Sequence, residues 1–375
     1  MTGIVATILL AMAGIGAAFN LVAAMLVRVP RPVAARREWP SVTVLKPLHG
    51  LEPGLEAKLE GLFAHGYAGA VQIVFGTGQA EDPALALARA VAARHPAAQV
   101  AFASDAPRIG ANAKLCNLAN MTPAVAHDVV VIADSDVAWM PDTLTRVVDA
   151  LEQPGVGLIS CLHIGRGDAG FWSRLAAMDI SYRYMPSVVL GQALGMAKPV
   201  LGPTMALRTA TLAQIGGFAA FTPVLADDYE LGRAVRALGL TSHVPDFFII
   251  HGSTEPTLRA LIRHELRWSV TIFRIDPAGF TGSIVTHAIL LALAAIAVGG
   301  AGPVALAVLV SAIVAELAIK RRIDRASGQS SGPLWLVPIR LVLSGVVFVA
   351  TFFVNKVDWR GAEFGVTRDG RLQIR

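Results

Sequence analysis

The sequence predicts a Rossmann-like α/β domain with a mostly parallel sheet, flanked by apolar segments of the kind that lie in membranes. Long apolar runs stand on either side of residues 41–275, whose own composition is mixed. Within 41–275, short apolar runs alternate with helix-like stretches, a pattern typical of parallel sheets. One such run, 129–133, leads directly into Asp134-Ser135-Asp136. Ligands bind at the carboxyl ends of the strands in an open α/β sheet, so the sequence predicts a ligand site there.

The N-terminal apolar run predicts a membrane anchor over residues 1–30. The chain of 375 residues is 54% hydrophobic and 16% charged, whereas ordinary soluble proteins are about 25% charged. Residues 3–27, interrupted by Asn20, are long enough to cross a hydrocarbon core of about 30 Å. The run has no basic start and no small-residue cleavage site, which favours an anchor over a signal peptide. The basic residues that follow predict that this end faces the cytoplasm: Arg28, Arg31, Arg36 and Arg37.

A second membrane region is predicted over residues 281–354. Glycines and Pro303 divide its first part into segments near 283–298 and 304–319. Basic residues follow the second segment, as expected for a hairpin that returns to the cytoplasm: Lys320, Arg321, Arg322 and Arg325.

The last apolar stretch, Leu334–Val354, has two features that argue against a full crossing. Pro338 and Arg340 lie inside it. A crossing would also place the basic tail over 355–375 outside, against the positive-inside rule. We therefore expect an interfacial or re-entrant segment, followed by a cytoplasmic tail that carries Lys356, Arg360, Arg368, Arg371 and Arg375.

The basic character of the chain does not indicate nucleic acid binding. The net charge is +5 and the pI is near 9.5, but the basic residues cluster beside the apolar runs, where anionic lipids attract them. We find no aromatic and basic RNA-binding motif, so no nucleic acid partner is expected. Cys116 and Cys161 are the two cysteines of the chain, which excludes a disulfide framework and a cysteine zinc site.

Charged residues stand where four successive predicted strands end. The strands are expected at 41–45, 71–76, 100–102 and 129–133. In the same order, the charged residues are Lys46, Asp82, Lys114 and the pair Asp134 and Asp136. The carboxyl ends of parallel strands meet at one edge of a sheet, so these side chains are expected close together. Such a group of acids and lysines suits an anionic nucleotide.

Each of these residues also has a simpler interpretation. Lys46 could be a solvated strand end, Asp82 the N-cap of a helix that starts at Pro83, and Lys114 a surface lysine. The aspartate pair could cap a helix before Pro141. The chain has no G-x-x-x-x-G-K-[ST] loop and no G-x-G-x-x-G fingerprint, which argues against a P-loop nucleotidase and a dinucleotide-binding enzyme.

Asp134 and Asp136 are candidate metal ligands. Side chains alternate along an extended backbone, so the two carboxylates would project to the same side. A hard cation that carries phosphate oxygens is bound by such ligands, with its other positions left to substrate and water.

Two further motifs lie closer to the C-terminus of this domain. Asp227-Asp228-Tyr229 precedes a helix expected over 230–238, where acids could complement the helix dipole or supply a carboxylate base. Arg263-His264-Glu265-Leu266-Arg267-Trp268 precedes the predicted hairpin and could be a solvated face that binds lipid headgroups.

In this order, the motifs resemble those of the lipid-linked and processive GT-A glycosyltransferases. More closely, the chain resembles glycosyltransferase family 21, the ceramide glucosyltransferases and their bacterial hopanoid-associated relatives. The resemblance covers roughly residues 41–275, with similar membrane segments beyond. It is carried by Lys46-Pro47-Leu48, Glu81-Asp82-Pro83, Asn112-Ala113-Lys114, Asp134-Ser135-Asp136, Pro141-Asp142-Thr143-Leu144, Asp227-Asp228-Tyr229 and Arg267-Trp268.

The resemblance implies a GT-A fold and a role for each matched residue. It implies that Asp82 contacts uracil, that Lys46 and Lys114 belong to the donor site, and that Asp228 is the catalytic base. It also implies that Asp134 and Asp136 serve the ribose–diphosphate and a divalent metal, Mg²⁺ or Mn²⁺. Arg267 and Trp268 match the end of the family's catalytic (Q/R)-x-x-R-W motif, whose first position is His264 here. That departure leaves the role of the first position open.

The function implied by the resemblance is inverting transfer of a sugar from a UDP-sugar to a hydroxyl group of a membrane lipid. The favoured pair is UDP-N-acetylglucosamine and a hopanoid, bacteriohopanetetrol; the alternative is ceramide glucosyltransferase activity with UDP-glucose. The expected location is the bacterial inner membrane, multi-pass, with the catalytic domain cytoplasmic. A processive polysaccharide synthase would need more membrane spans to form a channel for a polar polymer. A non-catalytic membrane-binding module would not need metal ligands, a base and a nucleotide lysine in one chain.

Overall fold

The computed structural model describes residues 2–34, 36, 38–224 and 226–354. It also describes the backbone of three short antiparallel strands, β11 (Lys356–Trp359), β12 (Ala362–Val366) and β13 (Leu372–Ile374). Several basic residues of the predicted cytoplasmic segments lie outside the described residues: Arg37, Arg360, Arg368, Arg371 and Arg375.

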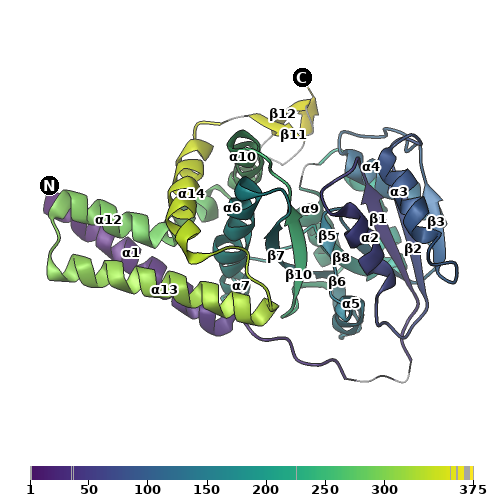
Figure 1. Ribbon diagram of the computed structural model, residues 1–375, viewed down its shortest axis with the longest axis horizontal. Coiled ribbons are helices and arrows are strands. Elements are labelled where there is room, and N and C mark those ends of the chain that lie inside the picture. Colours follow the sequence, from purple (N-terminus) through teal and green to yellow (C-terminus); the bar gives the residue numbers. More distant parts are fainter. Residues whose placement is uncertain are drawn as a thin grey trace.

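A seven-stranded, mostly parallel sheet forms the centre of the domain, with strand order β3-β2-β1-β4-β8-β6-β9 (Figure 1). Its strands are β1 (Val42–Leu48), β2 (Val71–Thr77), β3 (Gln99–Ala103), β4 (Val129–Ala133), β6 (Val156–Ser160), β8 (Thr204–Arg208) and β9 (Thr241–His243). Strands β1 to β4 are parallel neighbours, whereas β8 runs antiparallel between β4 and β6. The expected α/β class with a mostly parallel sheet is confirmed.

Helices follow the strands as crossover connections. They are α2 (Leu55–Phe63), α3 (Pro83–Ala92), α4 (Ala113–Met121), α5 (Thr143–Leu151), α8 (Thr209–Gln214) and α9 (Asp227–Ala237), with single turns η1 (Thr122–Ala124) and η3 (Phe218–Phe221). Two of them begin at side-chain caps that the sequence supplies locally: Asp82 accepts a hydrogen bond from Ala84 N, and Asn112 accepts one from Leu115 N.

A smaller sheet, β5-β10-β7, stands beside the main one. Its strands are β5 (Val137–Ala138), β7 (Leu162–Gly167) and β10 (Phe248–Ser253). Between these strands and after them, the chain forms α6 (Phe171–Asp179), the π-helix η2 (Ile180–Tyr184), α7 (Met185–Ala193) and α10 (Leu258–Ile275). Because β5 follows Asp136 directly, this sheet brings β10 to the end of β4.

Four helical segments of the described chain are long and apolar enough to cross a membrane. They are α1 (Thr2–Leu26), the run Pro277–Gly299, α13 (Pro303–Ser327) and the run Leu334–Thr351. The second comprises α11 (Pro277–Gly282), η4 (Ser283–His287) and α12 (Ala288–Gly299), and the fourth comprises η5 (Leu334–Leu336) and α14 (Val337–Thr351). Figure 1 shows α1, α12 and α13 as a bundle that projects away from the sheets.

Small residues allow close packing in this bundle. A Cβ atom on Gly16 would lie 1.9 Å from the Val285 carbonyl oxygen, and one on Gly299 would lie 2.6 Å from Ala6 Cβ. These contacts lie near opposite ends of α12, so α1 and the second segment pack along their length.

Three element boundaries differ from the expectation. Strand β1 continues through Lys46-Pro47-Leu48, where a break was expected, because β2 pairs with β1 to its end. Pairing with β4 stops at Leu45, so Pro47 lies where that side of β1 is an open edge, a position that tolerates proline. Helix α9 begins at Asp227 rather than Glu230, and α13 continues to Ser327, so that its basic residues belong to its last turns.

Candidate functional site

A cleft of about 510 Å³ opens where β1, β2 and β4 end. Four of the predicted site residues line it: Asp82, Lys114, Asp134 and Asp136. The side chains of Glu52, Arg108 and Asn117 also line it. These four charged residues therefore lie together at the carboxyl ends of the parallel strands, as expected.

Lys114 lies in the first turn of α4 and pairs with acids from two other elements. Its Nζ is 2.7 Å from Asp134 Oδ1 and 3.5 Å from Asp227 Oδ2. Burial disfavours the charged amine, but Asp134 and Asp227 outweigh it and raise the pKa of Lys114. The interpretation of Lys114 as a surface lysine is wrong, since it is a largely buried cation inside the cleft.

Asp136 faces His251 of β10, a residue that was not among those predicted from the sequence. Asp136 Oδ2 is 3.3 Å from His251 Nε2. Hydrogen bonding fixes this approach, because Gly252 N donates to the Asp136 carbonyl oxygen at 2.9 Å. Asp136 Oδ1 is buried and has no hydrogen-bond partner. The one sequence signal for His251 was a histidine in an otherwise apolar strand, which is not specific.

The pair of Asp136 and His251 fits a divalent cation. A carboxylate oxygen without a partner and an imidazole nitrogen are both donors that Mn²⁺ and related ions accept. Within the described part of the chain, no three His, Cys, Asp or Glu side chains form a cage. A cation held here would therefore take its remaining ligands from a diphosphate and water.

Lys46 lies beneath the cleft rather than in it. It is fully buried in β1, and its Nζ donates to the carbonyl oxygens of Asp134 and, at 3.1 Å, Val137. Burial lowers the pKa of Lys46 to about 8. The interpretation as a solvated strand end is wrong: the ammonium group holds the backbone that carries Asp134 and Asp136.

Glu52 is a second site residue that the sequence did not reveal. Its Oε1 accepts a hydrogen bond of 2.9 Å from Ser135 Oγ, and its Oε2 is buried without a hydrogen-bond partner. Burial and the nearby Asp136 carboxylate raise the pKa of Glu52. It adds a third carboxylate to the end of β4.

Asp82 has two local roles that agree with its simpler interpretation. Its Oδ1 accepts hydrogen bonds from Ala84 N and from Gly50 N, both at 2.9 Å. The first caps α3, and the second closes the turn after β1. The same carboxylate lines the cleft, so capping and ligand contact are compatible.

Asp228 stands at the start of α9, next to the acid that pairs with Lys114. Its Oδ1 accepts a hydrogen bond of 2.7 Å from Tyr229 N. A Cβ atom on Gly202 would lie 3.3 Å from Asp228 Oδ2, so the glycine leaves room for this carboxylate. Burial and Asp227 raise the pKa of Asp228 to about 7. Asp228 is thus a carboxylate with the basicity that a general base needs.

Helix α10 brings Arg267 and Trp268 to the same region. The ring centroid of Trp268 lies 6.1 Å from those of His251 and Tyr184, and 4.8 Å from that of His264. Burial and the charge of Asp228 raise the pKa of Tyr184, while His251 pairs with Asp136, so both ring neighbours of Trp268 interact with predicted site residues. His264 pairs through Nδ1 with the buried Glu255.

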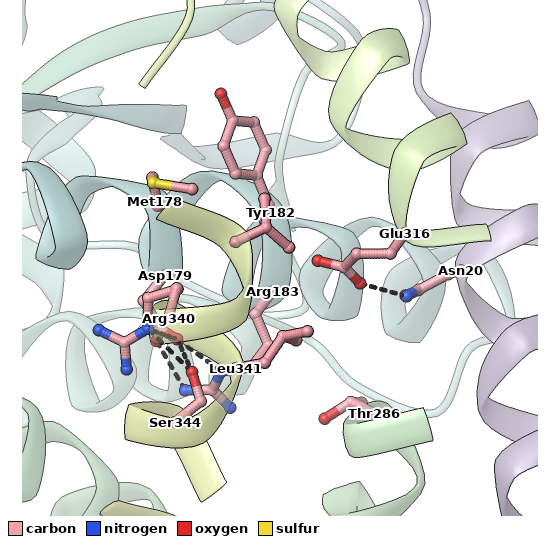
Figure 2. Close-up of a pocket in the computed structure, with 11 residues that line it drawn as sticks. Asn20, Met178, Asp179, Tyr182, Arg183, Thr286, Glu316, Arg340, Leu341 and Ser344 are labelled. Carbon is pink, nitrogen blue, oxygen red and sulfur yellow. Dashed lines mark hydrogen bonds and ion pairs between the residues drawn. The ribbon is translucent and has the colours of Figure 1, made fainter. Parts of the chain in front are cut away.

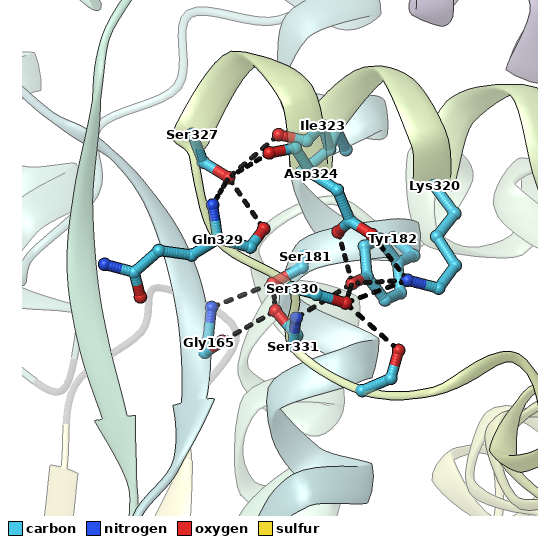
Figure 3. Close-up of polar contacts among 11 residues, drawn as sticks. Gly165, Ser181, Tyr182, Lys320, Ile323, Asp324, Ser327, Gln329, Ser330 and Ser331 are labelled. Atoms are coloured by element: carbon cyan, nitrogen blue, oxygen red, sulfur yellow. Dashed lines mark hydrogen bonds and ion pairs between the residues drawn. The ribbon is translucent and has the colours of Figure 1, made fainter.

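The π-helix η2 connects the site to the bundle of apolar helices. Tyr182 donates a hydrogen bond of 2.6 Å to Asp324 of α13, and Ser331 Oγ donates one of 2.6 Å to the Gly165 carbonyl oxygen (Figure 3). Tyr184, which also belongs to η2, packs near Trp268 of α10. A π-turn frequently marks a functional position, and here it ties the bundle to the site.

A charged cluster joins α14 to α10 and α6. Arg340 binds Glu265 through two hydrogen bonds of 2.5 and 2.8 Å, and Ser344 Oγ donates to Asp179 at 2.7 Å. Figure 2 shows Asp179, Arg340 and Ser344 on one side of a cavity of about 20 Å³, with Glu316 and Asn20 on the other. Glu265 belongs to the same helix as Trp268, so Arg340 supports the helix that completes the site.

Replacing Arg340 with methionine is expected to lower the free energy of unfolding by about 3–5 kcal/mol, because Glu265 would remain a largely buried carboxylate without its cation. Unfolding in detergent micelles measures the change. The matched control is the double variant Arg340→Met with Glu265→Gln, which should be more stable than Arg340→Met alone. Losses that simply add in the double variant would mean that the two residues do not interact.

Comparison with known proteins identifies the family of this chain. Residues 5–372 match the family model described as glycosyl transferase family 21. Ceramide glucosyltransferase 1 of Caenorhabditis elegans is 22% identical over 230 residues, which are 61% of this chain and 49% of that protein. Ceramide glucosyltransferase of Komagataella phaffii is 29% identical over 116 residues, 30% of this chain and 23% of that protein. The chain thus spans about half the length of the first relative.

One solved structure shares the fold over most of the chain. It is a mannosyltransferase from Pyrobaculum calidifontis in complex with GDP-Man and Mn²⁺, with a TM-score of 0.53 and 21% identity. The match covers 93% of this chain and 99% of that one, and it confirms the expected GT-A-like fold. Because the family model matches nearly the whole sequence, the chain belongs to glycosyl transferase family 21.

Proposed function

We propose that this protein is an inverting glycosyltransferase that moves a sugar from a UDP-sugar to a hydroxyl group of a membrane lipid. The observation that carries the proposal is a cleft lined by Lys114 and Asp136, with His251 paired to Asp136 and with Asp228 close enough to Lys114 for the two charges to interact. Together they provide a cation for the nucleotide, donors for a metal and a carboxylate base.

The donor nucleotide would occupy the cleft between β2, α4 and β4. Asp82 accepts two backbone hydrogen bonds through Oδ1, and its Oδ2 accepts one of 3.1 Å from Gly50 N. A carboxylate oxygen accepts more than one hydrogen bond, so Asp82 can also receive the N3–H of uracil. Lys114 would compensate the negative charge of the nucleotide, as its place in the lining of the cleft supports.

Asp136 and His251, with Asp134 beside them, would hold a Mg²⁺ or Mn²⁺ ion. When bound, such an ion neutralises charge that develops on the diphosphate leaving group. Lys46 and Glu52 fix the backbone and Ser135 around these ligands, which keeps both carboxylates directed into the cleft. The ligand positions are thus set before the donor arrives.

Asp228 would take the proton from the acceptor hydroxyl as the new bond to the sugar forms. A raised pKa suits this role, because the carboxylate is a stronger base than an ordinary aspartate yet is ionised in a large fraction of molecules near neutral pH. Attack from the face opposite the diphosphate inverts the anomeric centre, so an α-linked donor gives a β-linked product.

The acceptor would be a lipid alcohol. Helices that are apolar enough to cross a membrane pack against the domain that carries the site, and the named relatives are ceramide glucosyltransferases. Two pairs fit equally well: UDP-N-acetylglucosamine with a hopanoid such as bacteriohopanetetrol, and UDP-glucose with ceramide. The arginines after α1 support a catalytic domain on the cytoplasmic side. The proposed location is the bacterial inner membrane.

A reaction with the purified protein tests the proposal. Radiolabelled UDP-glucose and UDP-N-acetylglucosamine are each offered with ceramide and with bacteriohopanetetrol, with Mn²⁺, Mg²⁺ or a chelator. We expect one labelled lipid product that depends on the metal and is absent for Asp136→Asn. A labelled polymer without labelled lipid would identify a polysaccharide synthase, and no turnover of any pair would overturn lipid glycosylation by this protein.

A further inference from the structure

Helix α14 lies beside α10 over most of its length. Near its start, Arg340 binds Glu265 with both guanidinium nitrogens. Just past its end, the Phe352 ring centroid is 5.2 Å from that of Phe273. Figure 1 shows the same arrangement, with α14 next to α10 and α6. The two helices must therefore have the same position relative to the membrane.

Helix α10 is unsuited to the hydrocarbon core. It carries six ionisable residues, Arg259, Arg263, His264, Glu265, Arg267 and Arg274, and it is not among the described helices that are apolar enough to cross a membrane. A charged side chain at the centre of a bilayer costs about 2.5–3.5 kcal/mol even on the most lenient scale. A helix that packs along α10 is held at the membrane surface with it.

The contacts of α14 with the bundle point the same way. A Cβ atom on Gly345 would lie 2.6 Å from Leu290 Cδ1, close to the start of α12. The ring of Phe348 is 5.1 Å from that of His287, just before α12. Figure 1 shows α14 running across the direction of α1, α12 and α13. It therefore meets the end of the bundle that is nearest the domain, instead of running along the bundle as a fourth member.

The two faces of the segment differ sharply. Arg340, Ser344 and Thr351 are buried against the rest of the protein. The opposite face is a continuous stripe of apolar side chains, 42–79% exposed and spaced three or four residues apart. Its members are Trp335, Ile339, Val342, Val346, Val349 and Phe353. A helix with a polar face against the protein and an apolar stripe on the opposite side is suited to a lipid interface.

We propose that α14 does not cross the membrane but lies along the cytoplasmic surface of the bilayer, with this stripe in lipid and its polar face against the domain. The helix meets the apolar bundle at Leu290 and His287, and the exposed Trp335 is an aromatic residue of the kind that anchors proteins at membrane interfaces. The inference is independent of which sugar or lipid reacts. It places α10, with Arg267 and Trp268, one helix diameter from the bilayer, where a lipid hydroxyl arrives.

Single cysteines in membrane vesicles of both orientations test the proposal. Val354→Cys reports the end of α14, Arg325→Cys the exposed end of α13, and Ala301→Cys the connection between α12 and α13. Each variant is treated with a membrane-impermeant maleimide. Cys116 and Cys161 are buried, so the unmodified chain serves as the background control.

We expect Val354→Cys and Arg325→Cys to be labelled from the same side and Ala301→Cys from the other. Labelling of Val354→Cys together with Ala301→Cys would show that α14 crosses the membrane and would overturn the proposal.

A second variant, Val346→Cys, tests what covers the stripe. Formation of a disulfide between two copies through Cys at this position would identify a second chain, not lipid, as its occupant and would also overturn it.

Discussion

Replacing Asp228 with asparagine is expected to lower kcat by about 10²–10⁴, because an amide of the same shape cannot take the proton of the acceptor hydroxyl. The KM for the UDP-sugar should change little, since Asp228 lies beside Gly202 and is not among the residues that line the cleft. Steady-state kinetics with the lipid acceptor measure both constants. A near-normal kcat in this variant would exclude Asp228 as the base.

The pH profile of the same pair of proteins gives a second readout. The pKa of Asp228 is raised to about 7, and a base acts only when it is deprotonated. The kcat of the unmodified protein should therefore rise with pH up to and through about 7, and Asp228→Asn should lose that rise. Glu230→Gln on the same helix is the matched control, because Glu230 pairs with Arg233 at the surface and its loss should leave the profile intact.

Replacing Asp136 with asparagine is expected to have the other large effect, a loss of at least about 10² in kcat at a fixed Mn²⁺ concentration. The physical reason is that Asp136 supplies a buried carboxylate oxygen with no competing hydrogen bond. His251→Ala should shift the Mn²⁺ requirement in the same direction, because its Nε2 is 3.3 Å from the other oxygen. Paramagnetic resonance of added Mn²⁺ measures binding without turnover.

The control for the metal experiment lies in the same small sheet. His163 of β7 is buried, with its ring centroid 5.5 Å from that of His251, but it makes no ion pair with Asp136. His163→Gln should leave the Mn²⁺ affinity within a few fold of the unmodified protein. If Asp136→Asn bound Mn²⁺ as tightly as the unmodified chain, the metal assignment would be wrong.

Much of the site was accessible from local patterns. The apolar run 129–133 predicted a buried strand. In this fold, the residues that follow such a strand lie at the edge of the sheet where ligands bind. Asp82 and Asn112 stand where helix caps belong, so the helices after β2 and β3 could be anticipated. These features depend on residues close in sequence, which is why the expectation held for them.

Other parts of the site had no local signal. His251 and Glu52 meet the end of β4 because β10 pairs with β5 and because Ser135 reaches Glu52. Sequence alone left Lys46 as a strand end with more than one interpretation. Pairing of β1 with β2, together with hydrogen bonds to the carbonyl oxygens of Asp134 and Val137, buries it completely. Pairing of distant strands decides burial, and no short window of sequence contains it.

The amino-acid sequence by itself determined the alternation of strands and helices, the acids at the strand ends and the places of the apolar segments along the chain. All of these follow from periodicity and composition within a few residues. Only the tertiary structure decided that Asp136 faces His251, that Arg340 in an apolar helix binds Glu265, and that α14 lies along α10. These contacts join segments far apart in the chain, and their free energy comes from packing and from pairing of buried charges, which exist only once the elements have assembled.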